Sequence, residues 1–181
     1  MKKLTIALVH LGAILLAPQL YAAEGVINAT GKIKEGTCSL NSDAKNLLVD
    51  LGTSAAGSKT ERDFRFTLTG CPPSLTQARF LFEGTAVSPT GRDIDKNVFA
   101  ATNASEPGAA QNAGFLIHYR QGNSTMVVTP NKQTEAFILD PSRDVNTLYF
   151  SAMTESWGLN EAENSGYGTV SADIQFSLIY P

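Results

Sequence analysis

The sequence predicts an all-β protein with the architecture of an immunoglobulin-like sandwich. Helical periodicity is almost absent along the chain, whereas short runs of alternating apolar and polar residues recur. Segments rich in Gly, Pro, Asn, Ser and Asp separate these runs, as expected of turns. Seven or eight short strands in about 160 residues suit one sandwich domain and are too few for two.

The first residues read as a secretory signal peptide. Lys2 and Lys3 precede the apolar run LTIALVHLGAILLA, residues 4–17, and small residues follow it. A run of this length is too short to cross a bilayer comfortably, which argues against a membrane anchor. We therefore expect residues 1–22 to be a signal peptide, with cleavage near Ala22 or Ala23 and export of the remainder.

The exported chain is acidic. Cleavage removes two lysines and no acid, which leaves 12 basic and 17 acidic residues and a net charge of −5. The sequence contains no cluster of Lys and Arg, and phosphate binding requires such a cluster. No nucleic-acid partner is expected.

The runs that predict strands are distributed over the whole exported chain. One of them, DFRFTLTGC, alternates Phe64, Phe66 and Leu68 and ends at a cysteine. The predicted extended segments cover residues 25–40, 46–52, 63–71, 78–84, 113–120, 125–129, 146–153 and 170–181.

Two longer segments between these runs lack strand character. Residues 88–112 predict a long surface excursion with either a short helix or a hairpin. Residues 155–168 form a polar acidic loop that holds Trp157, the only tryptophan. We expect this tryptophan to fill a packing gap rather than to form a ligand platform.

The two cysteines, Cys38 and Cys71, predict a disulfide, because an exported protein meets an oxidising environment. Closing a loop of this length stabilises by about 3–4 kcal/mol on the chain-entropy model. Two free buried thiols are the alternative. A metal site is not expected, since the chain has no CxxC motif and His118 is the only histidine of the exported part.

Catalytic motifs are absent from the sequence. His118 is the one candidate general base, but it lies in a predicted strand and no GxSxG elbow accompanies it. The carboxylate pairs Asp93/Asp95 and Glu161/Glu163 lie in predicted loops, where acidic side chains are ordinarily solvated. Phosphate loops and dinucleotide-binding motifs are also missing. The sequence predicts neither an enzyme nor a cofactor.

The final run, VSADIQFSLIYP, has one apolar face and no strand after it to cover the neighbouring edge. Such an edge leaves apolar side chains and backbone hydrogen-bonding groups exposed. The residues predicted to line this exposed groove are Val170, Ala172, Ile174, Phe176, Leu178 and Tyr180.

The segment AEGVINATGKI, residues 23–33, also alternates, and the sequence offers it no partner strand. It can pair within its own sheet, remain disordered, or add to the sheet edge of another molecule. If it fills the groove of another copy, each buried isoleucine contributes about 1.5–3 kcal/mol. Such head-to-tail contacts build an open fibre. The residues on its small and apolar face are Gly25, Ile27, Ala29, Gly31 and Ile33.

Several motifs, in their order along the chain, resemble the chaperone–usher fimbrial subunits of the type 1 pilin family. They are the cysteine spacing, FRFTLTGC before Cys71, ARFLFEG, AQNAGFLIHYR, LYFSA and SGYGTVSADIQFSLIYP. The resemblance covers essentially all of the chain. It implies an incomplete immunoglobulin-like sandwich that lacks its last strand, here residues 34–181, with residues 23–33 as an N-terminal donor-strand extension.

The resemblance also implies a function. A periplasmic chaperone lends a strand to the groove and anchors the carboxylate of Pro181. The extension of the next subunit then replaces that strand at the outer-membrane usher. On this mapping the chain is a structural subunit of a fimbrium on the bacterial surface that supports cell adhesion. The short stretch from Ala23 to Cys38 is similar to the extensions of minor tip-adaptor subunits. The alternative is a self-contained secreted β-sandwich that binds a carbohydrate or a receptor through its loops.

Overall fold

The computed structural model describes residues 36–41, 46–53, 58–88, 93–157 and 167–181. The chain divides into two units, Met1–Ile33 and Lys34–Pro181. The first unit, with the predicted signal peptide (1–22) and donor segment (23–33), lies outside the described residues. Both assignments therefore remain predictions.

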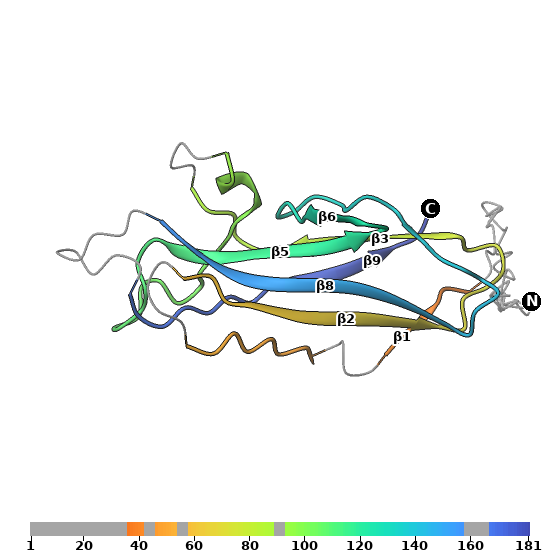
Figure 1. The fold of residues 1–181 in the computed structure, drawn as a ribbon, viewed down its shortest axis with the longest axis horizontal. Helices are drawn as coiled ribbons and strands as arrows, with labels where there is room; N and C mark the ends of the chain where they lie inside the picture. The colour runs from red at the N-terminus through yellow and green to blue at the C-terminus, as the bar shows by residue number, and fades with distance from the viewer. Residues whose placement is uncertain (1–35, 42–45, 54–57, 89–92, 158–166) are drawn as a thin grey trace, which may run out of the picture. The chain divides into compact units, whose positions relative to one another are not determined.

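The described part of the second unit is built mainly from strands, with a short 3-10 helix between two of them (Figure 1). The strands are β1 (Ser39–Leu40), β2 (Glu61–Thr69), β3 (Gln77–Glu83), β4 (Phe99–Ala100), β5 (Ala113–Gln121), β6 (Ser124–Val127), β7 (Phe137–Ile138), β8 (Val145–Ser156) and β9 (Gln175–Ile179), and the helix is η2 (Asp95–Asn97).

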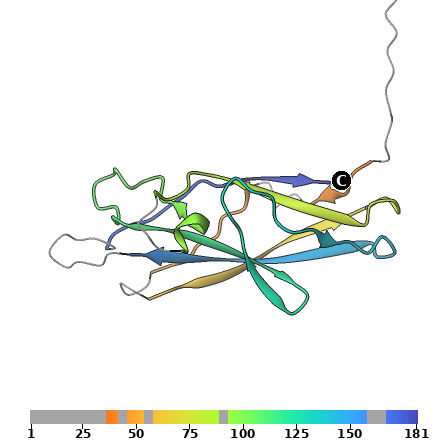
Figure 2. The same ribbon diagram turned by 90° about the horizontal axis from the view of Figure 1, so that it is seen from above.

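The strands form two antiparallel sheets. The larger sheet has the order β1-β2-β8-β5-β4, with β6 pairing β5, and the smaller has the order β7-β3-β9. Figure 2 shows the β5–β6 hairpin projecting away from the rest of the larger sheet. The all-β sandwich predicted from the sequence is thus confirmed.

Phenylalanine rings from both sheets form the centre of the core. Phe66 of β2 lies 4.8 Å, between ring centroids, from Phe80 of β3 and 5.2 Å from Phe150 of β8. All three side chains are buried. This packing follows from the alternation within each strand, because one face of every strand turns toward the opposite sheet.

A smaller apolar cluster consists of Val87, Val98 and Leu116. Trp157 packs against it, so this side chain has the packing role predicted from the sequence. The prediction that residues 88–112 are a surface excursion was wrong for Val98 and Phe99, whose side chains are fully buried. Residues 99–100 form β4, which pairs with β5. The apolar pair VF is too short for a period-two pattern, and tertiary contacts decide its place.

Two other strand predictions differ from the structure, and one short strand was missed. Residues 46–52 form no strand ladder, and the last predicted strand is shorter, because only Gln175–Ile179 pairs with another strand. Strand β7 was not predicted. Its two residues pair with Gln77 and Ala78, and so short a strand depends on its partner rather than on its own sequence.

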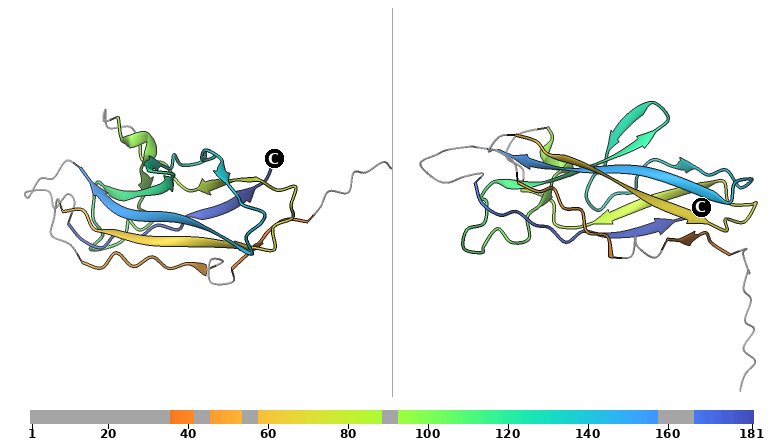
Figure 3. Two further views of the ribbon diagram at one scale, coloured as in Figure 1. Left: turned by 45° about the vertical axis from the view of Figure 1, so that its right-hand side comes forward. Right: turned by 60° about the horizontal axis from the view of Figure 1, so that its bottom comes forward.

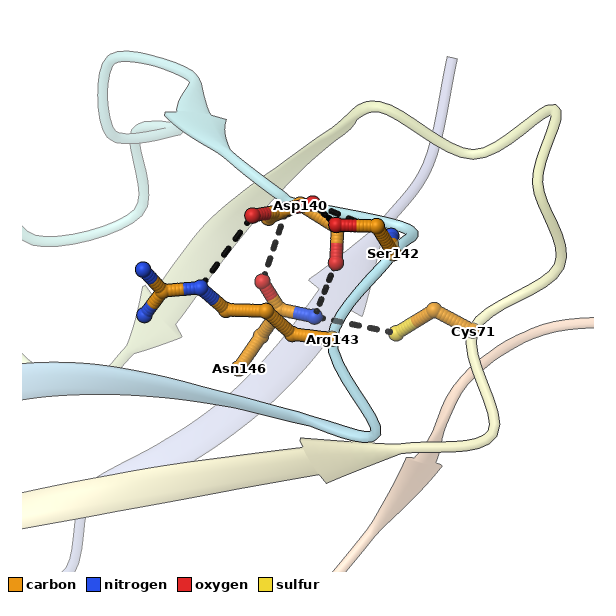
Figure 4. A network of polar contacts seen from close by, with 5 residues as sticks. All are labelled: Cys71, Asp140, Ser142, Arg143 and Asn146. Atoms are coloured by element: carbon orange, nitrogen blue, oxygen red, sulfur yellow. Dashed lines mark hydrogen bonds and ion pairs between the residues drawn. The ribbon is translucent and has the colours of Figure 1, made fainter.

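The loop between β7 and β8 is tied to the disulfide by Asn146, a buried residue of β8 (Figure 4). The side-chain oxygen of Asn146 accepts a hydrogen bond from the Asp140 amide at 2.7 Å. Its Nδ2 donates to the Asp140 carbonyl at 3.1 Å and lies 4.0 Å from the sulfur of Cys71. These contacts satisfy a buried amide that would otherwise destabilise the fold.

Candidate functional site

An open groove of about 1020 Å³ lies in the described part of the chain. One wall is the segment 46–52 and the other is the stretch 170–178, which contains most of β9. The right-hand view of Figure 3 includes both walls, with the segment before β2 in orange and β9 in blue.

Apolar side chains from both sheets form the floor of this groove. Phe64 and Phe66 come from β2, Phe115 and Ile117 from β5, and Phe82 from β3. Phe66 is also at the centre of the core, so the groove opens directly onto the packed interior. An occupant of the groove would therefore bury apolar surface of the core itself.

Five of the six residues predicted to line the groove do so in the structure: Val170, Ala172, Ile174, Phe176 and Leu178. Each is half-buried, whereas the intervening Ser171, Asp173, Gln175 and Ser177 are exposed. The groove lining also includes Ser171, Asp173 and Gln175, so the alternation appears in the burial of the side chains rather than in which residues reach the groove.

The sixth residue, Tyr180, does not line the groove. Its ring packs against the main core cluster. Burial raises the pKa of its hydroxyl. The alternating pattern continues through Tyr180, but the wall of the groove ends before it.

The edge of β9 that faces the groove has no strand partner among the residues that the structure describes. Strand β9 pairs with β3 along its other edge, from Gln175↔Glu83 to Ile179↔Arg79. An edge of this kind presents unpaired N–H and C=O groups to an incoming extended segment.

The opposite wall is apolar and partly exposed. The exposed fractions are 88% for Leu48 and 41% for Leu47, while Leu51 is buried. The sequence analysis did not assign these residues to the site. The run NLLVDLG predicted a strand there, but nothing in the sequence indicated that this strand would face the last one across a gap.

The disulfide Cys38–Cys71 is present, as predicted. It joins the chain just before β1 to the chain just after β2. Asn41 adds a second link, because its side-chain oxygen accepts a hydrogen bond from the Thr67 amide at 3.1 Å. Both links hold the start of the segment that leads to the wall at 46–52.

Among the described residues, the surroundings of His118 do not form a serine–histidine pair. Its Nδ1 lies 3.7 Å from the Glu61 carboxylate, and the Ser151 hydroxyl donates to that carboxylate at 2.5 Å. A serine nucleophile needs its hydrogen bond to the histidine base, and here the serine binds the carboxylate instead. Within the described ranges, no group of three or more His, Cys, Asp or Glu side chains is placed to hold a metal ion. The same residues include no helix that is long and apolar enough to span a membrane.

Comparison with known proteins found no matching family model. Over 91 residues, 46% of this chain, the sequence is 29% identical to the S-fimbrial protein subunit SfaG of Escherichia coli O6:K15:H31 (strain 536 / UPEC). The match covers 52% of SfaG, so it spans about half the length of this curated relative.

Two solved structures are similar over most of the chain. The P pilus rod subunit PapA has a TM-score of 0.59 at 15% identity, with 81% of this chain and 100% of PapA covered. A chaperone–usher pilus solved in relation to rod uncoiling has a TM-score of 0.60 at 16% identity, with 91% and 100% covered. The chain has the pilin fold. The resemblance to chaperone–usher fimbrial subunits predicted from the sequence is confirmed.

Proposed function

We propose that this protein is a structural, non-enzymatic subunit of a bacterial fimbria, assembled by the chaperone–usher pathway through donor-strand exchange. The observation that carries the proposal is the groove. It is apolar along its floor, about 1020 Å³ in volume, and bounded by a strand whose groove-side edge has no strand partner in the described chain.

The proposed occupant is the segment 23–33 of a second copy. An extended chain rises about 3.3 Å per residue, so this segment spans about 36 Å and the wall 170–178 spans about 30 Å. Ile27 and Ile33 supply large apolar side chains for the groove, and Gly25, Ala29 and Gly31 on the same face are small. Because donor and acceptor sit on different copies, the contact repeats head to tail into a fibre.

The remaining partners follow from the same mechanism. A periplasmic chaperone occupies the groove during transit and anchors the C-terminal carboxylate of Pro181, and an outer-membrane usher exchanges it for the next subunit. The signal-like residues 1–22 support export, and the finished fimbrium lies on the cell surface and supports adhesion. The short stretch 23–37 favours a minor or tip-adaptor position.

Refolding by dilution tests the proposal. The chain from residue 23 is prepared with Ile27→Asp, so that its own extension is a poor donor. We expect low yield of soluble monomer without peptide and rescue by a wild-type peptide of residues 23–33. The matched control is the same peptide with Ile27→Asp, which should not rescue because a carboxylate would enter an apolar groove.

The opposite result is equally informative. If the Ile27→Asp chain refolds to a stable monomer without peptide, and the peptide changes nothing, the sandwich is complete without a donor. That outcome would favour the alternative, a self-contained secreted β-sandwich that binds a carbohydrate or a receptor through its loops.

A further inference from the structure

We propose that the loop 101–111, named here the clamp loop, preforms one end of the groove and that Asn103 is its positioning residue. The inference rests on the proposed function and adds a named residue to the strand-accepting site. It concerns the part of the wall that precedes β9, where β3 no longer provides a partner.

The side chain of Asn103 bridges Ser171 of the wall and Thr169, which directly precedes the wall. Its Oδ1 accepts a hydrogen bond from the Ser171 amide at 2.9 Å. Its Nδ2 lies 3.3 Å from both the carbonyl oxygen and the hydroxyl of Thr169. The residue is 7% exposed, so these bonds form largely away from water, where an unsatisfied amide would be costly.

Backbone hydrogen bonds reinforce this bridge. The Thr102 amide donates to the Ser171 carbonyl and the Ala110 amide donates to the Thr169 carbonyl, both at 2.8 Å. The Thr169 amide donates to the Gly108 carbonyl at 2.9 Å. Figures 1 and 2 both show the green clamp loop beside the dark blue chain that leads into β9.

The close approach depends on a glycine. Gly168 has a φ of +126°, and a Cβ at this position would lie 2.4 Å from the Gly108 carbonyl oxygen. A side chain here would therefore separate the wall from the clamp loop, and its backbone conformation would be strained.

The direction of these hydrogen bonds determines which backbone N–H and C=O groups of the wall remain available to an incoming strand. In an extended chain the N–H and C=O groups of successive residues point to opposite edges. Since the groups of Thr169 and Ser171 point to the clamp loop, those of Val170 and Ala172 point to the other edge. Val170 and Ala172 also line the groove. The clamp loop thus holds this part of the wall in the conformation that an incoming strand needs.

Preorganisation of this kind raises affinity, because the incoming segment does not have to order the wall. Strand β3 does the same for Gln175–Ile179, and the clamp loop extends the support toward residue 169. Without Asn103, the end near Val170 should be less ordered before binding. The end backed by β3 should be unaffected.

Peptide affinity tests the inference. The chain from residue 23 with Ile27→Asp is the background, and binding of a labelled wild-type 23–33 peptide is followed by fluorescence anisotropy. Asn103→Ala removes the side-chain bonds to Ser171 and Thr169. It should weaken binding of the peptide by about tenfold. Asn103→Asp keeps the acceptor for the Ser171 amide and loses the donors to Thr169. Its affinity for the peptide should therefore fall by less than that of Asn103→Ala. Gln111→Ala is the matched control, because the Gln111 side chain donates within the clamp loop, to the Ala104 carbonyl at 2.8 Å, and makes no hydrogen bond to the wall among the described residues.

Shortened peptides separate positioning from a general loss of stability. Two peptides each lack three residues, one at the N-terminal and one at the C-terminal end. One of the two shortened peptides no longer reaches Val170. With that peptide, Asn103→Ala and the background chain should bind with equal affinity, whereas with the other peptide the variant should still bind more weakly. The inference would be overturned if Asn103→Ala lost the same affinity for both shortened peptides. It would also be overturned if Asn103→Ala and Gln111→Ala bound the full peptide equally well.

Amide hydrogen exchange of the peptide-bound chain gives a second readout. In Asn103→Ala the amides of Thr169 and Ser171 should exchange faster, while those of β9 residues bonded to β3 keep their protection. Unchanged exchange at both amides would contradict the role of Asn103. Failure of the background chain to bind any peptide would instead count against the proposed function, so the two failures are distinguishable.

Discussion

Asp140 shows how a turn sets the properties of a single side chain. Its carboxylate accepts hydrogen bonds from the Ser142 hydroxyl at 2.6 Å and the Ser142 amide at 3.0 Å. The Arg143 guanidinium lies 3.1 Å away (Figure 4). The Ser142 bonds chiefly, with a smaller contribution from Arg143, hold the pKa of Asp140 below its ordinary value.

This lowered pKa predicts a pH dependence. The ionised form is stabilised in the folded state, so its contribution is present above the ordinary Asp pKa of about 4. The contribution is lost as the pH falls through the lower pKa of the folded state. The urea midpoint of the peptide-bound chain should therefore exceed that of Asp140→Asn at neutral pH, and this difference should shrink below about pH 4. A difference that does not change with pH would contradict the assignment.

Residues with local patterns were predictable, and residues that act through distant contacts were not. Val170 and Phe176 line the groove, and the sequence indicated them because each lies two residues from another apolar position. Asn103 could not be assigned. A polar residue in a segment of Ala, Ser and Gly reads as an ordinary loop residue, and its partners lie 66 and 68 residues away.

Strand β9 has two roles, because its groove face is also part of the core. The ring of Phe176 lies 4.6 Å, between centroids, from Phe66 and 6.2 Å from Phe80. One face of a single strand therefore contributes to folding and to the proposed strand exchange. Its length was overestimated from the sequence, because residues 170–174 are bonded by the clamp loop or face the groove rather than pairing with a strand.

Phe176→Ser should damage both roles. Loss of a large ring from the core costs about 3 kcal/mol, and the groove also loses an apolar contact for its occupant. We expect a low yield of the chaperone-bound subunit in periplasmic extracts and weak binding of the 23–33 peptide. Ser177→Ala, on the exposed face of the same strand and outside the groove lining, is the control and should behave as wild type. Wild-type yield of the Phe176→Ser complex would count against the groove assignment.

The shape of the groove depends on how the segment before β2 is held in place, because residues 46–52 of that segment form one of its walls. Strand β1 contributes only two pairs, Ser39↔Thr69 and Leu40↔Leu68. The disulfide fixes the same segment covalently at Cys38. Its effect should therefore extend beyond stability to the shape of the groove.

Removal of the disulfide should lower stability and strand binding together. The bonded cysteines are separated by 33 positions. Closing such a loop stabilises by about 3–4 kcal/mol on the chain-entropy model. The double variant Cys38→Ala/Cys71→Ala should show a lower periplasmic yield and weaker binding of the 23–33 peptide. Titration of the wild-type exported protein for free thiols is the direct check, and two free thiols would refute the bond.

Alternation of apolar and polar residues is a property of neighbours in the chain, and it identified the sandwich, most of its long strands and the apolar face of the last run. The cysteine pair and the signal-like leader are equally local. A groove is different, because its two walls, residues 46–52 and 170–178, are more than a hundred positions apart. Folding brings them to opposite sides of one opening and places the clamp loop behind one of them. These relations depend on which surfaces are buried together in the complete core, and no short window of residues contains that information.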